Sequence, residues 1–418
     1  MNILILHRIP YQKINYHLGI DHDRHNVTYI GTAKQLANLP EGLRCARLER
    51  PGLKDTASEV LAILSDLKLH FDRVISLSEY ELLDAAKVRE ALGVPGASID
   101  EVMAVRDKLI MKHRAAAAGL RVPQALPLAE FLVQGGAPWP GRTVIKPVDG
   151  ASSEDVQVFD DPASLASALE SRQAGIPRLD QDLHANAERF EVETFITGPL
   201  LHLDGLVHNG KVVALVGSRY IGTCLDYAKG QPLGSVQFKL DAAQEQWVQR
   251  AIDAISLRSG AFHLEVIDDN GSGDWVFLEI ANRVGGADVV DTFEMATGIY
   301  LPAQELAILC GEQPDLPGSL RKTTFFGWFV FPGHHLPDGF VELDGHQSFC
   351  KSSELLRHSV LPRDTPLPRN ITYQAFEVPF SGVVGAESTT ALQAWMEALF
   401  AAVTLHPRLQ EEVREVPA

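Results

Sequence analysis

Short β-rich runs alternate with longer helical segments through the N-terminal part of the chain. Three runs have the composition of buried strands: NILILH at 2–7, NVTYIG at 26–31 and DRVISLS at 72–78. Helical spacing marks the segments at 59–70 and 79–93. This alternation predicts an open α/β domain of the Rossmann-like kind over residues 1–101.

One binding motif is missing from this predicted domain. HRIPYQK at 7–13 follows the first strand, where a dinucleotide-binding domain would carry GxGxxG. The sequence therefore disfavours an oxidoreductase that binds a dinucleotide.

Length, charge and cysteine usage exclude several further classes of protein. A chain of 418 residues is too long for one ordinary core and predicts several domains. The net charge of -17 disfavours general binding to nucleic acid or to an anionic membrane surface. The four cysteines have no CxxC spacing, which argues against a zinc site and a disulfide framework. The N-terminus reads as neither a secretory signal nor a spanning helix, so we expect a cytoplasmic protein.

Two lysines stand in segments that can meet an anion. Lys108 lies in the triplet RDK, early in a helix predicted over 101–118, where a solvated helix face is the alternative interpretation. Lys146 ends a β-branched run, where lysine is uncommon unless it reaches an anion. The loop that follows it is either a simple turn or a place where backbone N–H groups approach phosphate oxygens. Its small residues include Gly150, Ser152 and Ser153.

Carboxylates recur on the strands predicted further along. Glu191 and Glu193 share one face of the strand at 190–196, and a solvated face would explain that pattern. Two hairpins follow, with turns at 208–210 and at 268–274.

The second hairpin carries the most informative carboxylates. Glu265 and Glu279 stand on adjacent antiparallel strands, where two such groups can converge and then need a cation. Hard divalent ions accept carboxylate and amide oxygen, and magnesium shares its shell with nucleotide phosphates. Asn282, Gly285 and Gly286 would be enough to make the turn that follows, so the Glu279 carboxylate and the Arg283 guanidinium exceed what a turn requires.

The order of these pieces resembles the ATP-grasp superfamily of ligases. RDK in a helix is followed by IKP with a small-residue loop, by an acidic strand, and by a hairpin that ends in LEIANRVGG. The stretch SEYELLDAAKVREALGVPG, followed by RDKLIMKHRAAAAGLRVP, is most similar to the amino-acid-ligase branch, which includes dipeptide synthetases and carnosine-synthase-like enzymes.

The resemblance implies an α/β fold that is α+β in its ATP-binding lobes. The Rossmann-like domain would precede an ATP-grasp domain over 102–311. That domain would divide into a small lid lobe at about 115–195 and a larger lobe at about 196–311. A C-terminal α+β extension over 312–418 would form a cap or dimer element, with an amphipathic helix at 388–405.

The resemblance also implies a role for each candidate residue. ATP phosphates would be held by Lys108 and Lys146, the second also catalytic, under a lid formed by Gly150, Ser152 and Ser153. The adenine would be lined by Glu193, Phe195 and Ile196. Magnesium, with manganese as a substitute, would be held by Glu265 and Glu279, while Arg283 would neutralise the γ-phosphate or an acyl phosphate.

Two positions depart from the family pattern. Many members have E-x-N-P-R, but in this chain Asn282 lies three residues after Glu279, so either it turns in as a metal ligand or the metal keeps more water. Leu200 stands where related sequences often carry an acid for the ribose hydroxyls, and His202 and Asp204 are the candidates to replace it.

The implied reaction is ATP-dependent joining of a carboxylate to an amine through an acyl phosphate, with release of ADP and phosphate. Amino acids are the expected small-molecule substrates, and a homodimer is the prior for assembly. The segment at 218–238, with Arg219, is expected either to line the acyl pocket beside Arg283, Gly285 and Gly286 or to be a surface excursion. The alternatives are an ATP-grasp ligase of the purine-pathway or carboxylase type and an ATP-binding module without catalysis.

Overall fold

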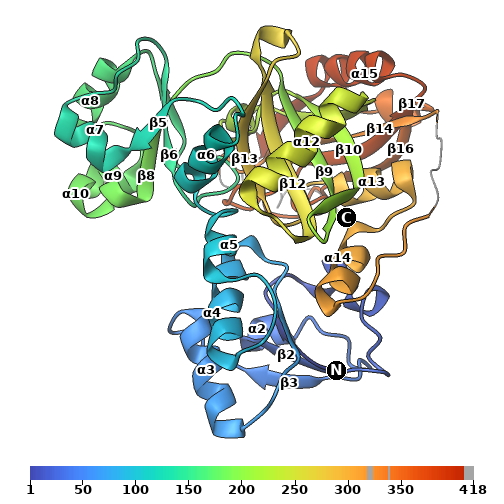
Figure 1. Ribbon diagram of the computed structural model, residues 1–418. Coiled ribbons are helices and arrows are strands. Elements are labelled where there is room, and N and C mark those ends of the chain that lie inside the picture. Colours follow the sequence, from blue (N-terminus) through green and yellow to red (C-terminus); the bar gives the residue numbers. More distant parts are fainter. Residues whose placement is uncertain (318–322, 338, 409–418) are drawn as a thin grey trace.

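The computed structural model describes residues 1–317, 323–337 and 339–408, and Figure 1 shows their arrangement. The blue N-terminal domain lies at one end of the molecule, a small green lobe stands to one side, and a large sheet occupies the middle. Among the described residues, no helix combines the length and apolar character that a membrane span needs.

The N-terminal domain is the open α/β domain that the alternation predicts. Its four parallel strands run in the order β3-β2-β1-β4. Their bounds are β1 Asn2–Leu6, β2 Asn26–Gly31, β3 Ala46–Glu49 and β4 Arg73–Ile75. Helices α3 (Thr56–Leu67) and α4 (Leu82–Leu92) cover the sheet through a core that includes Val60 and Val88. Strand β3 was not predicted, because most of its residues are exposed and it lacks an apolar run.

The single helix predicted over 101–118 is two helices. Helix α5 (Ile99–Met103) ends before the RDK triplet, and α6 (Lys108–Ala117) begins within it. The Asp107 carboxylate accepts hydrogen bonds from the backbone N–H groups of Leu109 and Ile110, and this cap starts the new helix. Lys108 is therefore the first residue of α6, and it is buried, so the alternative of a solvated helix face is wrong.

The small lobe is an antiparallel sheet covered by short helices. Its strands run in the order β5-β8-β6-β7, with bounds β5 Ala125–Pro127, β6 Thr143–Pro147, β7 Gln157–Phe159 and β8 Phe190–Thr194. The covering helices are α7 (Leu128–Gln134), α8 (Pro162–Glu170), α9 (Pro177–Gln181) and α10 (Leu183–Asn186). One face packs on these helices through Phe131, Leu165 and Phe190, so the lobe has its own core.

The central sheet has eight strands in the order β13-β12-β9-β10-β11-β14-β17-β16. The first five in chain order are β9 Leu200–His208, β10 Lys211–Ile221, β11 Leu233–Phe238, β12 Ser259–Asp268 and β13 Trp275–Ala281. Both predicted hairpins are present: Asn209 and Gly210 make a two-residue turn with positive φ, and residues 268–274 join β12 to β13. Helices α6 and α12 (Ala242–Ile255) cover one face of this end of the sheet, as Figure 1 shows, and α14 (Leu301–Cys310) packs near the other.

The described residues between 312 and 408 continue the same sheet. Strands β14 (Phe325–Phe331), β16 (Leu355–Val360) and β17 (Phe380–Ala386) extend it beyond β11. The predicted amphipathic helix is α15 (Thr389–Ala402), which packs on these strands through Leu392, Met396 and Leu399. A two-stranded sheet of β15 (Phe340–Asp344) and β18 (Thr404–Arg408) completes this part.

Candidate active site

A cavity of 310 Å³ lies between the small lobe and the central sheet. Both predicted lysines and both predicted metal-binding glutamates line it: Lys108, Lys146, Glu265 and Glu279. The predicted lid and adenine residues line it as well: Gly150, Ser152, Ser153, Glu193, Phe195 and Ile196. The two lobes therefore converge on one space, as an ATP-grasp fold requires.

Lys108 connects three segments at this cavity. Its Nζ lies 3.1 Å from Glu279 Oε2 and donates a hydrogen bond of 2.7 Å to the backbone carbonyl of Gly150. The cap at Asp107 fixes the start of α6, so the side chain is directed into the cavity and is largely buried. The Lys108 ammonium group thus contacts both the Glu279 carboxylate and the lid loop.

A β-bulge in β13 places the two glutamates face to face. Trp275 and Phe277 point into the core, so strict alternation would also direct Glu279 into that core. The register shifts by one residue between Phe277 and Glu279, and Glu279 pairs directly with Glu265 on β12. Both side chains then lie on the cavity side of the sheet.

Each glutamate has one oxygen held by the protein. Tyr220 donates a hydrogen bond of 3.0 Å to Glu265 Oε1. Burial alone would raise the pKa of Glu279, but the Lys108 and Lys146 cations lower it to about 2. Glu279 is therefore a carboxylate at neutral pH, which is the form that binds a metal ion.

Lys146 belongs to a buried network of four charges. Its Nζ lies 2.6 Å from Glu193 Oε1 and 3.7 Å from Glu191 Oε1. Lys112 Nζ lies 2.8 Å from Glu193 Oε2 and 2.5 Å from Glu191 Oε1. Burial alone would lower the pKa of Lys146, but the Glu193 and Glu191 carboxylates raise it above its ordinary value. The solvated face suggested for the two glutamates is wrong, because both are buried among lysines.

The sequence pattern missed Lys112. It follows Lys108 by four residues on α6, so the two side chains lie on the same face of the helix. That spacing was a usable signal, but nothing in the local sequence pointed to its partners on β8.

The lid loop is held by several contacts. Ser152 and Ser153 have φ values of 59° and 56°, in the left-handed region. Arg106 donates a hydrogen bond of 2.7 Å to the carbonyl of Asp149, and Arg178 pairs with Asp155. The loop lines both this cavity and the larger one beside it.

A second cavity of 680 Å³ adjoins the first. Glu265 and Glu279 line both cavities, so the second opens directly beside the predicted metal site. Its wall includes the residues predicted to contact substrate: Arg283, Gly285 and Gly286. The N-terminal domain contributes to the wall through residues 8–10, 12–15 and 77–80.

Arg283 is anchored by a glutamate that the sequence did not reveal. Its Nε lies 2.6 Å from Glu79 Oε2, and Arg106 pairs with the other oxygen of Glu79. Burial alone would lower the pKa of Arg283, but Glu79 raises it, so the guanidinium is charged. Glu79 follows β4 in the N-terminal domain, and its partner lies 204 residues away, which no local pattern could indicate.

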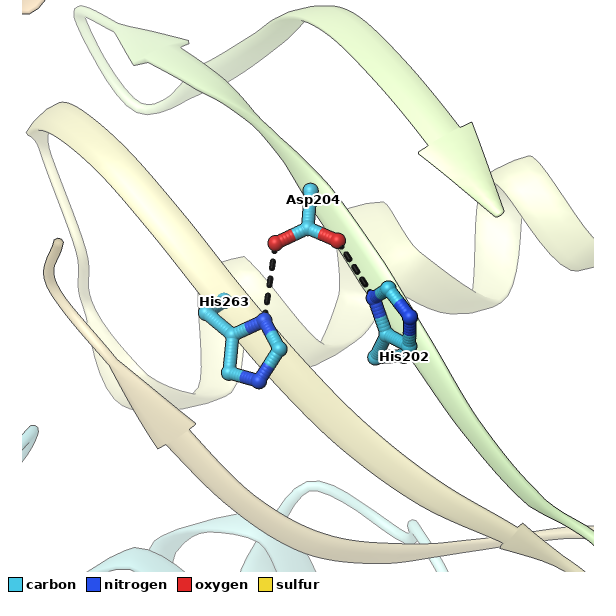
Figure 2. Close-up of side chains that lie close together, drawn as sticks. All are labelled: His202, Asp204 and His263. Carbon is cyan, nitrogen blue, oxygen red and sulfur yellow. Dashed lines mark hydrogen bonds and ion pairs between the residues drawn. The ribbon is translucent and has the colours of Figure 1, made fainter. Parts of the chain in front are cut away.

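His202 and Asp204 do not face the first cavity, and the proposed ribose role is not supported. Figure 2 shows Asp204 between two histidines, with one oxygen toward each. His202 Nδ1 lies 2.5 Å from Asp204 Oδ2, and His263 Nδ1 lies 2.7 Å from Asp204 Oδ1. His202 Nε2 contacts Ser235 Oγ at 2.6 Å, so this buried cluster satisfies its polar atoms internally.

Two further predicted residues lie away from the lining. The Asn282 amide donates hydrogen bonds to the carbonyls of Ala261 and Ser259, at 2.7 and 3.3 Å, and so points along β12 rather than at the glutamates. Arg219 alternates with Tyr220, which lines the second cavity, and therefore points to the opposite face of β10. The rest of its segment does reach the cavities, through Tyr220, Cys224 of α11 (Cys224–Ala228) and Leu233.

Comparison with known proteins agrees with this geometry. A family model described as "ATP-grasp domain" matches residues 140–291. The chain therefore contains an ATP-grasp domain.

Three known proteins illustrate the similarity. The chain is 24% identical over 276 residues to an L-arginine-specific L-amino acid ligase of Bacillus subtilis, a match that covers 63% of each chain. The chain thus spans 63% of the length of this curated relative. An L-amino acid ligase from Bacillus licheniformis has the same fold, with a TM-score of 0.69, 19% identity and coverage of 97% and 98% of the two chains. A biotin carboxylase from Campylobacter jejuni also shares the fold, with a TM-score of 0.64, 15% identity and coverage of 97% and 92%.

Proposed function

We propose that this protein is an ATP- and magnesium-dependent ligase that joins the carboxylate of one amino acid to the amine of another. One observation carries the proposal: Glu265 and Glu279 pair in register and line a cavity with Lys108 and Lys146. That arrangement suits a metal-bound triphosphate. The adjoining cavity supplies space for substrates at the same two glutamates.

The residues present fit a magnesium ion. Glu265 and Glu279 offer hard carboxylate oxygens from opposed positions on neighbouring strands. Asn282 is turned away, so water and phosphate oxygens would complete the shell. Bound magnesium would neutralise phosphate charge and orient the terminal phosphate.

The first step activates a carboxylate. A substrate carboxylate oxygen attacks the γ-phosphorus of ATP, the bond to the β,γ-bridging oxygen breaks, and ADP leaves with that electron pair. Lys108 and Lys146 offset the charge on the phosphates, and Arg283 offsets charge on the transferred group. Lys108 must exchange its contacts with Glu279 and Gly150 for phosphate oxygens.

The second step forms the amide. The amine nitrogen attacks the acyl carbon, phosphate leaves with the bridging oxygen, and the nitrogen loses a proton. Water would hydrolyse the acyl phosphate, so the lid at 150–153 must cover both cavities during this step. No covalent intermediate on the protein is needed.

A screen for phosphate release tests the proposal. The protein is incubated with ATP and Mg²⁺ and each pair of the twenty amino acids, and an amide product is sought by mass spectrometry. Release that depends on a particular pair is expected. Release with bicarbonate alone would instead indicate a carboxylase-type enzyme, and ATP binding without turnover under every condition would indicate a non-catalytic module.

Glu279→Gln provides the matched variant. The substitution keeps the shape of the side chain but removes the charge next to Lys108, so we expect phosphate release to fall at least ~100-fold while circular dichroism shows that the fold is retained. An unchanged rate would refute the metal assignment.

A further inference from the structure

The C-terminal edge of the N-terminal sheet forms one wall of the larger cavity. Strands β1 and β4 are parallel neighbours, with Ile5 paired to Ile75. The segments that follow them therefore emerge at the same edge, which is where open α/β sheets bind ligands. Arg8 follows β1, whereas Glu79 and Tyr80 follow β4, and all three line the cavity.

The HRIPYQK segment places its two basic side chains, Arg8 and Lys13, at this edge of the sheet. Helix α1 (Tyr11–Ile14) buries Tyr11 and Ile14, each 3% exposed, and leaves Lys13 on its outer side. The Arg8 guanidinium carbon lies 5.3 Å from the centre of the Tyr80 ring, within the range of a cation–π interaction. The segment that replaces a glycine-rich turn thus places two positive charges at the cavity.

The other charges on the cavity wall already have partners. Arg283 pairs with Glu79, and Glu279 pairs with Lys108 of the first cavity. Glu265 accepts from Tyr220, and Asp291 pairs with Arg357. By contrast, no carboxylate lies within ion-pair distance of Arg8 or Lys13 in the ranges 1–317, 323–337 and 339–408.

We propose that Arg8, with Lys13 beside it, binds the carboxylate of the amine substrate. This inference rests on the proposed ligase function and defines the second substrate as an amine that carries its own carboxylate. The acyl substrate must bring its carboxylate to the phosphate end, beside Lys108 and Glu279. The amine substrate then occupies the larger cavity, where Arg8 and Lys13 are the charges without an ion-pair partner among the described residues.

The geometry of the guanidinium suits this group. Arginine offers two parallel N–H donors that match a carboxylate, and a ring beneath it restricts its rotation. An uncharged amide in place of the carboxylate would lose the charge-assisted hydrogen bonds. Arg8 would therefore distinguish a free amino acid from its carboxamide.

Steady-state kinetics with the full-length protein test the inference. The amine substrate identified by the phosphate-release screen is supplied either as the free amino acid or as its carboxamide. Arg8→Ala should raise KM for the free acid by about tenfold or more and leave KM for the carboxamide and kcat unchanged. Arg8→Lys should recover part of the loss, and Arg250→Ala, which removes an exposed arginine on α12, should have no effect.

An unchanged KM for the free acid in Arg8→Ala, or an equal rise for acid and carboxamide, would overturn the inference and leave the ligase proposal intact. A screen that yields no amide from any pair would refute the ligase proposal instead. In that case the affinity of the Arg8 subsite can be measured without turnover, by calorimetric titration of the wild type and Arg8→Ala with the twenty amino acids and their carboxamides. The inference about Arg8 would be overturned if no free amino acid binds, or if Arg8→Ala does not weaken the binding of one that does.

Discussion

Replacing Lys112 by methionine should destabilise the protein far more than an ordinary lysine substitution. Lys112 is 3% exposed on its face of α6, and its Nζ contacts both Glu191 and Glu193. Without it, two buried carboxylates share one cation, Lys146, which lies 3.7 Å from Glu191 Oε1. Removing one partner of a buried ion pair costs about 3–5 kcal/mol, because it leaves a charge that neither solvent nor a partner stabilises.

Urea denaturation followed by circular dichroism measures this loss. Lys112→Met should lower the free energy of unfolding by ~3–5 kcal/mol, whereas the double variant Lys112→Met/Glu191→Gln should lose at most about half as much, since it removes one charge of each sign. Lys211→Met, which removes an exposed lysine at the start of β10, is the control. A loss of less than ~1 kcal/mol in Lys112→Met would refute the four-charge network as a stabilising feature.

Two further predictions concern single side chains. Arg219→Ala should leave the KM of every substrate unchanged, because the side chain points away from both cavities. A several-fold increase in the KM of any substrate would show that Arg219 contributes to substrate binding. Burial raises the pKa of Glu305 to about 7 from 4.5, so the folded state keeps a proton that the unfolded state loses, and stability falls as pH rises through this window. Glu305→Gln retains an acceptor for the Ala261 N–H and does not titrate. Its free energy of unfolding, relative to that of the wild type, should therefore rise by about 3 kcal/mol as the pH increases from 4.5 to 8. A difference between the two proteins that does not change with pH would contradict the burial argument.

Much of the local structure was predictable from the sequence. The second predicted hairpin located β12 and β13, and Asn209-Gly210 located the turn of the first long hairpin. The facing position of Glu265 and Glu279 was also expected, although the bulge that produces it was not. A bulge is one extra residue in one strand, and its position depends on the register of the partner strand.

The features that were missed depend on contacts between distant segments. Glu79 is an ordinary acid at the end of a strand until the fold brings Arg283 to it. His202 and Asp204 were expected to replace the ribose-binding acid because they lie close to Leu200 in the sequence, but in the structure they form hydrogen bonds with Ser235 and His263. The continuation of the central sheet by β14 could not be inferred, since pairing with β11 links strands separated by the whole of the second hairpin.

The break between α5 and α6 had a local signal that was overlooked. Asp107 is a good N-cap residue, and the apolar residues after it begin a new helical period. The break matters for function because it makes Lys108 the first residue of α6 and directs it to Glu279.

Transfer of oxygen from the acyl substrate to phosphate tests the central claim most directly. The acyl substrate found by the screen is labelled with ¹⁸O in its carboxylate and incubated with ATP, Mg²⁺ and the amine, and the released phosphate is analysed by mass spectrometry. Attack of the carboxylate on the γ-phosphorus predicts that each phosphate released with amide carries one oxygen from the substrate. Amide formation with unlabelled phosphate would contradict carboxylate activation by ATP in this site.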